Sequence, residues 1–427
     1  MMVRLQNRIV TGEIPAISSK SDAHRLLLAA ALADRETELA CNVLSDDIRA
    51  TARCLAALGA GVTFSDGRIL VRPIGSRQPA AQAVTLDCGE SGSTLRFLLP
   101  VVSALGQNGV FTGGGRLPER PVTQLRKAME AHGVRFSAPG TFPIHTSGAL
   151  LPGAYTLPGN VSSQYITGLL FALPLLSGDS VLHILPPVES APYIEMTLAT
   201  LRRFGICAEK RGDAYHIPGN QRYRTPGRVA VEGDWSNAAF FLAAGALGAP
   251  VTVTGLDLCS PQGDKAILDL LRRMGAVVET SQNAVRVSPG RLCGIAQDMA
   301  DIPDLAPVFA VAAACARAGT TRLENAGRLR LKESDRLAAI AELLQSLGVS
   351  CTQTADTLTV PGGQTVFGGR TSGFHDHRMV MAAAVASVCA AGPVTIEGAE
   401  AVEKSYPHFF KDWESIGGNV DVLDFSR

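Results

Sequence analysis

Serine, aspartate, lysine and arginine side chains gather where the most apolar segments of this 427-residue chain begin. The five starts that show this are residues 18–25, 89–96, 161–164, 301–304 and 375–378. Free backbone N–H groups and the positive end of the helix dipole make a helix start a binding place for anions. Serine and aspartate are also ordinary caps there, but Lys20, Arg25 and Arg378 oppose the dipole. These cations therefore predict a bound anion.

A second set of cations stands in the more polar segments between these starts. Arg120 and Lys404 are expected at equivalent starts of further helices. Lys332 and Arg336 are four residues apart, which predicts that they share one helical face, with Glu333 beside Lys332. Arginine holds phosphate or carboxylate through two parallel hydrogen bonds. Cations from both halves of the chain are thus expected to meet across a cleft and to hold a substrate with several negative groups.

An internal repeat supplies the elements that must position these residues. Six helices are predicted to end at glycines that recur every 69 to 74 residues, namely Gly59, Gly133, Gly205, Gly275, Gly348 and Gly417. Between them lie six very apolar helices, predicted over residues 25–33, 94–105, 164–176, 237–247, 305–316 and 378–391, each leading into a β-branched strand. The chain therefore reads as six copies of one α/β unit, each with one buried and one more exposed helix.

Six units exceed one core of ordinary domain size, so a division into three plus three is expected. The boundary is predicted near the linker at residues 220–228, which is rich in arginine, glycine and proline. A first strand is predicted over residues 3–10, ahead of the first unit, and it could belong to either half.

Composition excludes several classes of protein. Lys+Arg 39 balances Asp+Glu 39, so no overall positive field exists to hold nucleic acid or an anionic membrane. Hydrophobic residues make up 46% of the chain, which excludes a disordered protein. Two uncharged stretches, residues 235–256 and 379–396, are interpreted as a buried helix followed by a strand rather than as membrane spans.

Cysteine usage and missing motifs narrow the choice further. The 9 cysteines form no Cys-x-x-Cys pair, which argues against a disulfide framework or zinc site and favours a reducing cytoplasm. The first twenty residues lack an apolar signal core, so we expect a soluble, cytoplasmic protein. No nucleotide-binding loop is present, and the pair His375 and His377 has no further ligand nearby in the sequence. We therefore expect no metal.

These segments resemble the 5-enolpyruvylshikimate-3-phosphate (EPSP) synthase family over essentially the whole chain. The segments that carry the resemblance are residues 19–21 with Arg25, 89–96, 119–121, 161–164, Asp304, 330–337 and 376–379, of which 332–337 is especially specific. The resemblance implies an α/β fold of two domains, each with three βαβαββ units that place helices inside and sheets outside, an inside-out α/β barrel. It implies a first domain over residues 18–228, a second over residues 1–17 plus 229–427, and an active site in the cleft between them.

The implied reaction transfers the enolpyruvyl group of phosphoenolpyruvate to the 5-hydroxyl of shikimate 3-phosphate and releases phosphate. It proceeds by addition and elimination, without a metal or organic cofactor, on the route to chorismate and the aromatic amino acids. The resemblance implies that Asp304, Glu333, Lys20 and His377 are catalytic. It implies that shikimate 3-phosphate contacts Lys20, Ser21, Arg25, Ser162, Ser163, Gln164, Tyr193, Asp304 and Lys332. It implies that phosphoenolpyruvate contacts Lys20, Gly92, Arg120, Gln164, Arg336, Arg378 and Lys404.

One departure and three alternatives stay open at this point. Family members often have Gly-Asn-Ala-Gly-Thr where residues 89–93 here include Glu90, and a glutamate beside an anion must turn away or pair with a cation. A UDP-N-acetylglucosamine enolpyruvyl transferase would carry a reactive cysteine in the loop that holds Arg120, and none occurs between Cys88 and Cys207. A non-catalytic anion-binding protein would not need Asp304. A kinase is disfavoured because the nucleotide loop is missing. We expect a monomer that binds only these small molecules.

Overall fold

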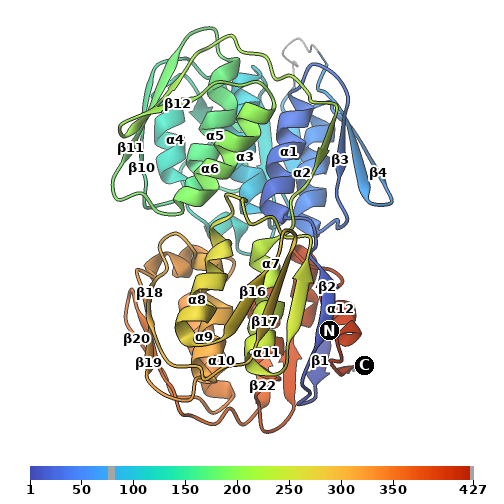
Figure 1. The fold of residues 1–427 in the computed structure, drawn as a ribbon. Coiled ribbons are helices and arrows are strands. Elements are labelled where there is room, and N and C mark those ends of the chain that lie inside the picture. The colour runs from blue at the N-terminus through green and yellow to red at the C-terminus, as the bar shows by residue number, and fades with distance from the viewer. Residues whose placement is uncertain (76–81, 424–427) are drawn as a thin grey trace. The chain divides into compact units, whose positions relative to one another are not determined.

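The computed structural model describes residues 1–75 and 82–423 and divides the chain into two compact units. Unit 1 comprises Met1–Ser19 together with the described residues from Glu232 onward, and unit 2 comprises Lys20–Val231. The chain therefore leaves unit 1 directly before Lys20 and returns to it after Val231. In each unit the helices lie inside and the sheets outside (Figure 1).

Each unit contains three four-stranded sheets of one topology. In every sheet the first two strands of the spatial order are parallel and the remaining neighbours are antiparallel. In unit 2 the orders are β14 (Arg228–Ala230), β3 (Thr37–Ala40), β5 (Arg68–Arg72), β4 (Gly61–Ser65); β6 (Val84–Asp87), β7 (Gly109–Thr112), β9 (Ile144–Ser147), β8 (Arg135–Phe136); and β10 (Ala154–Pro158), β11 (Ser180–Leu185), β13 (Ala214–Ile217), β12 (Glu209–Arg211).

Unit 1 repeats this order with strands taken from both ends of the chain. Its sheets are β2 (Gly12–Pro15), β15 (Val251–Thr254), β17 (Ala284–Ser288), β16 (Val277–Thr280); β18 (Ala296–Asp298), β19 (Thr320–Glu324), β21 (Leu358–Pro361), β20 (Thr352–Gln353); and β22 (Gly369–Ser372), β23 (Val394–Glu397), β1 (Met2–Leu5), β24 (Val420–Val422). The single strand predicted over residues 3–10 is wrong. The segment forms β1 and β2, which pair in two different sheets because the chain turns away after Leu5 and resumes at Gly12.

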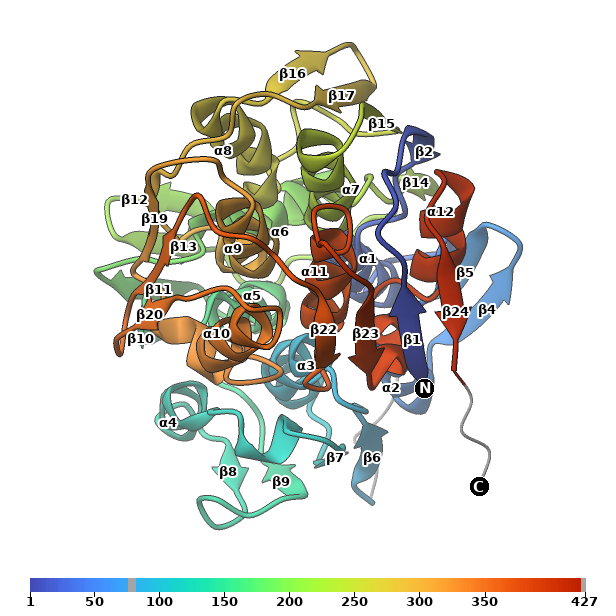
Figure 2. The same ribbon diagram turned by 90° about the horizontal axis from the view of Figure 1, so that it is seen from below.

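The six apolar helices expected from the repeat are confirmed, with ends that differ by a few residues. They are α1 (Lys20–Ala31), α3 (Gly92–Ala104), α5 (Ser163–Ala172), α7 (Trp235–Leu247), α9 (Ala306–Ala314) and α11 (His377–Ala386). Every residue of α9 and α11 is buried. Figure 2 shows α7, α9 and α11 at the centre of unit 1 with its strands around them.

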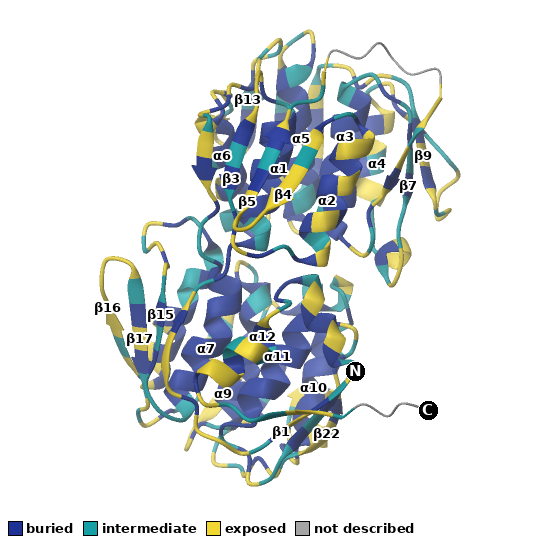
Figure 3. Cartoon of the chain, turned by 90° about the vertical axis from the view of Figure 1, so that its right-hand side faces the viewer, coloured by how far each residue is buried: buried dark blue, intermediate teal, exposed yellow. Residues whose placement is uncertain are grey.

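The second helix of each repeat is amphipathic and lies nearer to the surface. These helices are α2 (Asp46–Ala57), α4 (Thr123–Glu130), α6 (Ala191–Arg203), α8 (Ile267–Met274), α10 (Arg336–Ser346) and α12 (Phe409–Ser415). Buried and exposed residues alternate around α2, as Figure 3 shows. The six recurrent glycines follow them with backbone φ between 73° and 111°, in the left-handed region that ends a helix at glycine.

Two further features bear on the sequence predictions. Cys315 and Cys389 form a disulfide between the segments that follow α9 and α11, although the sequence argued against a disulfide framework. They stand 74 residues apart, so equivalent positions of two neighbouring repeats bring them together, which a search for close cysteine pairs does not reveal. Within the described residues, no helix has the length and apolar character needed to cross a membrane.

Candidate functional site

Asp304 is the centre of a charged cluster in unit 1. It lies in the short 3₁₀ helix η4 (Pro303–Leu305), directly before α9. One of its carboxylate oxygens accepts a hydrogen bond from Arg336 at 2.8 Å, and the other accepts from Arg378 at 2.9 Å. The Lys332 ammonium lies 3.6 Å from the same carboxylate. Three of the predicted site cations thus meet on one predicted catalytic carboxylate.

Arg336 holds the rest of this cluster together. Its side chain is 1% exposed, and it donates to Asp376 at 2.9 Å and to Glu333 at 2.6 Å as well as to Asp304. Burial opposes the charge on this guanidinium, but the three carboxylates outweigh burial and raise the pKa of Arg336. Asp376 is the N-cap of α11 and also accepts from the backbone of Arg378 at 3.0 Å.

The other predicted residues of unit 1 surround this cluster. Burial lowers the pKa of Lys332 to about 8, although the nearby Asp304 acts in the opposite direction. His377 is 1% exposed, and its Nδ1 lies 3.9 Å from Asp376. The Lys404 ammonium donates to the backbone carbonyl of His375 at 2.7 Å. The start of α11 and the end of η6 (Ala399–Lys404) therefore lie together.

Three expectations about local structure in these segments are wrong. Lys332 and Arg336 do not share a helical face, because Lys332 follows η5 (Gly327–Leu331) whereas Arg336 begins α10. They meet through Asp304 instead. Lys404 does not start a helix, because it is the last residue of η6 and α12 begins only at Phe409. Arg120 does not start a helix either, because it follows η1 (Leu117–Glu119) and stands ahead of α4.

In unit 1, the cations at helix starts have carboxylate partners in the chain itself. The opposition between a cation and the helix dipole predicts a bound anion at Arg336 and Arg378, and in unit 1 Asp304, Glu333 and Asp376 supply negative charge there. Sequence reasoning missed Asp376 as a site residue, although it stands inside the segment 375–378. Asp376 both caps α11 and orients Arg336, and its place in the sequence indicates only the first of these functions.

A second buried carboxyl group lies close to Asp304. Asp264, in η3 (Gly263–Ala266), is 2% exposed and accepts a short hydrogen bond from Ser236 at the start of α7. Burial and the negative charge of Asp304 raise the pKa of Asp264 to about 7, while Arg378 acts in the opposite direction. Neither Asp264 nor Ser236 was predicted, because no motif in the sequence relates residue 264 to residue 304.

In unit 2, the start of α1 presents Lys20, Ser21 and Arg25. The Lys20 ammonium forms an ion pair with Asp47 of α2 at 3.0 Å. Arg25 donates to the carbonyl oxygens of Ser21 at 2.7 Å and of Tyr193 at 2.8 Å. The structure therefore brings Tyr193, at the start of α6, to the predicted residues of α1.

Arg25 is held almost entirely by uncharged oxygens. Its Nε donates to the Thr197 hydroxyl at 2.9 Å, and its guanidinium lies 5.4 Å from the centre of the Phe97 ring. Burial lowers the pKa of Arg25 to about 10, with Asp22 and Tyr193 acting in the opposite direction. The side chain stays protonated at neutral pH, and its hydrogen-bond partners are uncharged, although the Asp22 carboxylate acts on its charge.

The starts of α3 and α5 are joined by Gln164. Its amide oxygen accepts from Arg96 at 2.7 Å, and its amide nitrogen donates to Ser93 at 2.9 Å. Ser162 caps α5 by accepting from the backbone N–H of Gln164 at 3.3 Å, and Ser163 is the buried first residue of that helix. Arg96 was not predicted as a site residue, although it belongs to the segment 89–96.

Arg120 lies directly against Gly92 at the start of α3. A Cβ atom at Gly92 would stand 2.6 Å from the Arg120 guanidinium, so a larger residue at this position would displace that side chain. Glu90, the departure from the family pattern, points toward Gly115, where an added Cβ would meet its carboxylate at 2.2 Å. The chain thus places this carboxylate at the glycine turn after β7.

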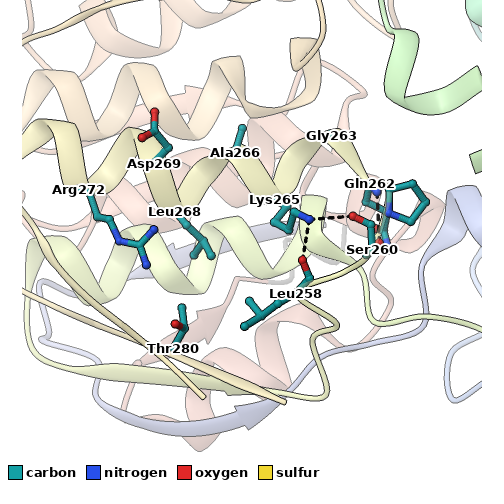
Figure 4. Close-up of a pocket in the computed structure, with 11 residues that line it drawn as sticks. Leu258, Ser260, Gln262, Gly263, Lys265, Ala266, Leu268, Asp269, Arg272 and Thr280 are labelled. Carbon is teal, nitrogen blue, oxygen red and sulfur yellow. Dashed lines mark hydrogen bonds between the residues drawn. The ribbon is translucent and has the colours of Figure 1, made fainter. Parts of the chain in front are cut away.

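Of two cavities among the described residues, one includes a predicted site residue in its wall and the other does not. In unit 2, a cavity of about 270 Å³ under α4 includes Arg120 in its wall. In unit 1, a more open cavity of about 650 Å³ is lined by residues of the segment 258–280 and contains none of the predicted site residues (Figure 4). Its Lys265 donates to the carbonyl oxygens of Leu258 and Ser260 at 2.6 and 3.0 Å, as the dashed lines show. That cation is bound to the backbone rather than presented to a ligand.

Comparisons with known proteins identify the family to which this chain belongs. Residues 5–413 match the family model described as EPSP synthase (3-phosphoshikimate 1-carboxyvinyltransferase). The chain is 39% identical to the 3-phosphoshikimate 1-carboxyvinyltransferase of Clostridium kluyveri, over 96% of each chain. It is 40% identical to that of Halobacterium salinarum, over 96% of this chain and 98% of the relative.

A solved structure supports the fold. The EPSP synthase of Acinetobacter baumannii superposes with a TM-score of 0.82 at 25% identity, over 99% of this chain and 100% of the other. The six-repeat inside-out α/β fold expected from the sequence is therefore confirmed. The chain belongs to the EPSP synthase family, and its activity is that of a 3-phosphoshikimate 1-carboxyvinyltransferase in the shikimate pathway.

Proposed function

We propose that both units contribute to one substrate site for shikimate 3-phosphate and phosphoenolpyruvate. Both molecules are anions that carry a phosphate and a carboxylate. The starts of α1, α3 and α5 in unit 2 offer backbone N–H groups, serine hydroxyls and cations to such anions. The observation that carries the proposal is the Asp304 carboxylate, which lies between Arg336 and Arg378 and beside Lys332.

Asp304 is the proposed base. The attacking 5-hydroxyl must lose a proton as its oxygen bonds to C2 of phosphoenolpyruvate, and the methylene carbon must gain one. Both oxygens of Asp304 are fixed by arginines, so the carboxylate is already oriented when substrate arrives. Glu333, which shares Arg336 with Asp304, is the proposed partner in proton transfer. Lys20 and His377 are the further proposed catalytic residues.

The remaining residues are proposed to bind the two substrates. For shikimate 3-phosphate the proposed contacts are Lys20, Ser21, Arg25, Ser162, Ser163, Gln164, Tyr193, Asp304 and Lys332. For phosphoenolpyruvate they are Lys20, Gly92, Arg120, Gln164, Arg336, Arg378 and Lys404. Support comes from the contacts within each unit, where Gly92 adjoins Arg120 and where Arg336 and Arg378 share Asp304.

A phosphate-release assay on the purified chain tests this function. Phosphate should appear when shikimate 3-phosphate and phosphoenolpyruvate are both present, and at background rate when either is omitted. Replacing shikimate 3-phosphate with UDP-N-acetylglucosamine should also give background rate. Release with the sugar nucleotide alone as acceptor would favour the sister transferase, and binding without release would favour a non-catalytic relative.

We also propose that the protein works in the cytoplasm as a monomer. The absence of Cys-x-x-Cys pairs and the seven free cysteines among the described residues support the first statement, while the Cys315–Cys389 disulfide counts against it. Light scattering of the purified chain should give a mass near 44.8 kDa. Twice that mass would refute the monomer.

A further inference from the structure

A chain of buried hydroxyl groups connects the starts of α1 and α3 in unit 2. His24 of α1 lies with its Nδ1 2.7 Å from the hydroxyl of Thr51 on α2. The Thr51 hydroxyl lies 2.7 Å from that of Thr94, and Thr94 donates to the Ser91 hydroxyl at 2.8 Å. All four side chains are at most 4% exposed. Packing alone would be served better by apolar side chains at such positions, since buried polar groups cost free energy unless paired.

The hydrogen bonds that link these four side chains all run in one direction, from His24 to Ser91. Thr94 uses its single hydroxyl proton on Ser91, so Thr51 must donate to Thr94. Thr51 has then used its own proton, so Nδ1 of His24 must donate to Thr51. Burial lowers the pKa of His24 to about 3, with Lys20 and Arg25 acting the same way and Asp47 against them. The ring is therefore neutral at physiological pH, with its one proton on Nδ1.

His24 and Ser91, the two ends of this row of hydrogen bonds, lie beside residues of the proposed phosphoenolpyruvate site. His24 is one helical turn from Lys20, and both belong to α1. Ser91 is the N-cap of α3, and it accepts from the backbone N–H of Thr94 at 3.2 Å directly ahead of Gly92. The chain of hydroxyls thus fixes the start of one helix relative to the start of the other. Hydrogen bonds aligned in series also polarise one another.

We propose that Thr51 is a positioning residue that, through His24 and Thr94, holds Lys20 and Gly92 at the separation phosphoenolpyruvate requires. Thr51 belongs to α2, and its hydroxyl reaches α1 at His24 and α3 at Thr94. It acts only through its hydroxyl, which accepts from one partner and donates to the other. The inference rests on the proposed function, because Lys20 and Gly92 are proposed substrate contacts.

The variant Thr51→Val keeps the shape of the side chain and removes the hydroxyl. It leaves the Nδ1 proton of His24 without an acceptor and leaves Thr94 without a donor. We expect KM for phosphoenolpyruvate to rise about tenfold, with kcat changed much less, because without the Thr51 hydroxyl the starts of α1 and α3 are no longer held at the separation that the ligand requires. Thr51→Ser should restore the wild-type KM. Thr200→Val is the matched control, since Thr200 is equally buried and donates only to its own helix backbone at Met196.

The second readout is the tautomer of His24, which can be measured without an activity assay. In ¹⁵N spectra of the full chain, His24 should show a protonated Nδ1 in the wild type and in Thr51→Ser, and lose that preference in Thr51→Val. A wild-type proton on Nε2, or an unchanged KM in Thr51→Val, would overturn the proposal. If the wild type itself released no phosphate, the proposed function would fail, while the tautomer would still report on the direction of the chain.

Discussion

The two units repeat one topology, but they hold their buried arginines in opposite ways. In unit 1, Arg336 and Arg378 donate to carboxylates, and the pKa of Arg336 is raised. In unit 2, Arg25 and Arg96 donate to hydroxyl, amide and carbonyl oxygens, and burial lowers the pKa of Arg25 to about 10.

This difference separates two tasks that the proposed reaction requires. Carboxylate partners neutralise a guanidinium, but they also supply groups that can exchange protons. Uncharged partners satisfy the hydrogen bonds of a guanidinium and leave its charge available to an anionic ligand. Unit 1 is accordingly the proposed source of proton transfer, and unit 2 the source of fixed positive charge and hydrogen-bond donors. The variants below remove or alter the groups of unit 1 and are ordered by their expected effect on activity.

Asp304→Asn should have the largest effect. Asparagine keeps an oxygen for one arginine but cannot take a proton, so turnover should fall about 10²–10⁴-fold. Binding of shikimate 3-phosphate should fall much less, because the amide oxygen still accepts a hydrogen bond. Steady-state rates and calorimetry on one preparation measure both quantities. Asp301→Asn, at an exposed neighbouring position, is the control. Turnover near wild type would remove Asp304 as the base.

The same variant tests the cluster as a structural element. If Asp304 were only a helix cap, asparagine would replace it at little cost. Because Asp304 instead accepts from two arginines, its neutralisation should lower the free energy of unfolding by about 1–3 kcal/mol. Chemical denaturation would detect this. Equal stability of variant and wild type would show that the ion pairs contribute nothing to the fold.

Arg378→Lys should have the next largest effect. Arg378 donates to Asp304 with one terminal nitrogen, and in the proposed site its guanidinium also binds phosphoenolpyruvate. An ammonium group cannot hold both partners in that geometry, so KM for phosphoenolpyruvate should rise about 10–100-fold, the range of one charged hydrogen bond. Arg273→Lys, on the exposed side of α8, should change nothing. Unchanged phosphoenolpyruvate kinetics would take Arg378 out of the site.

Lys332 should give the enzyme a pH-dependent affinity for shikimate 3-phosphate. Its pKa near 8 means that it loses its positive charge as the pH rises above 8, while the phosphate group stays fully ionised. The dissociation constant should therefore increase above pH 8, by at most about tenfold per pH unit for one proton. Calorimetric titrations between pH 7 and pH 9.5 measure this. Lys332→Arg should flatten the curve, and an identical curve in that variant would exclude Lys332 as the titrating group.

Most of the fold, and much of the candidate site, followed from the sequence. The six glycines and six apolar segments predict the repeat because helix termination and burial are local properties of the chain. The split of residues 3–10 into β1 and β2 could not be predicted, since both strands are completed by segments more than 200 residues away. The partners of Arg336 were hidden for the same reason: Asp304 and Asp376 are 32 and 40 residues distant in sequence. Pairing of this kind depends on tertiary structure, which periodicity does not reveal.

Asp264→Asn should affect activity least and yet reveal how the carboxylates of unit 1 are coupled. Asp264 lies buried against Ser236, and the charged groups that act on it are Asp304, Arg378 and Asp234. Its pKa is raised from 3.8 to about 7, so between these values the folded protein holds a proton that the unfolded chain has lost. The free energy of unfolding of the wild type should therefore decrease as the pH rises through this window.

The asparagine side chain of Asp264→Asn is neutral at every pH, so this position causes no such decrease in the free energy of unfolding of the variant. The stability of Asp264→Asn relative to wild type should consequently grow from pH 4 to pH 7, by at most about 1.4 kcal/mol per pH unit, and stay level above pH 7. Taking the difference between the two proteins cancels every group that titrates alike in both. Asp269→Asn, at an exposed position of α8, supplies the control, because an exposed carboxylate has little to gain from neutralisation. Parallel stability curves for Asp264→Asn and wild type would mean that folding does not raise the pKa of Asp264, and that its carboxylate is ionised beside Asp304 throughout this pH range.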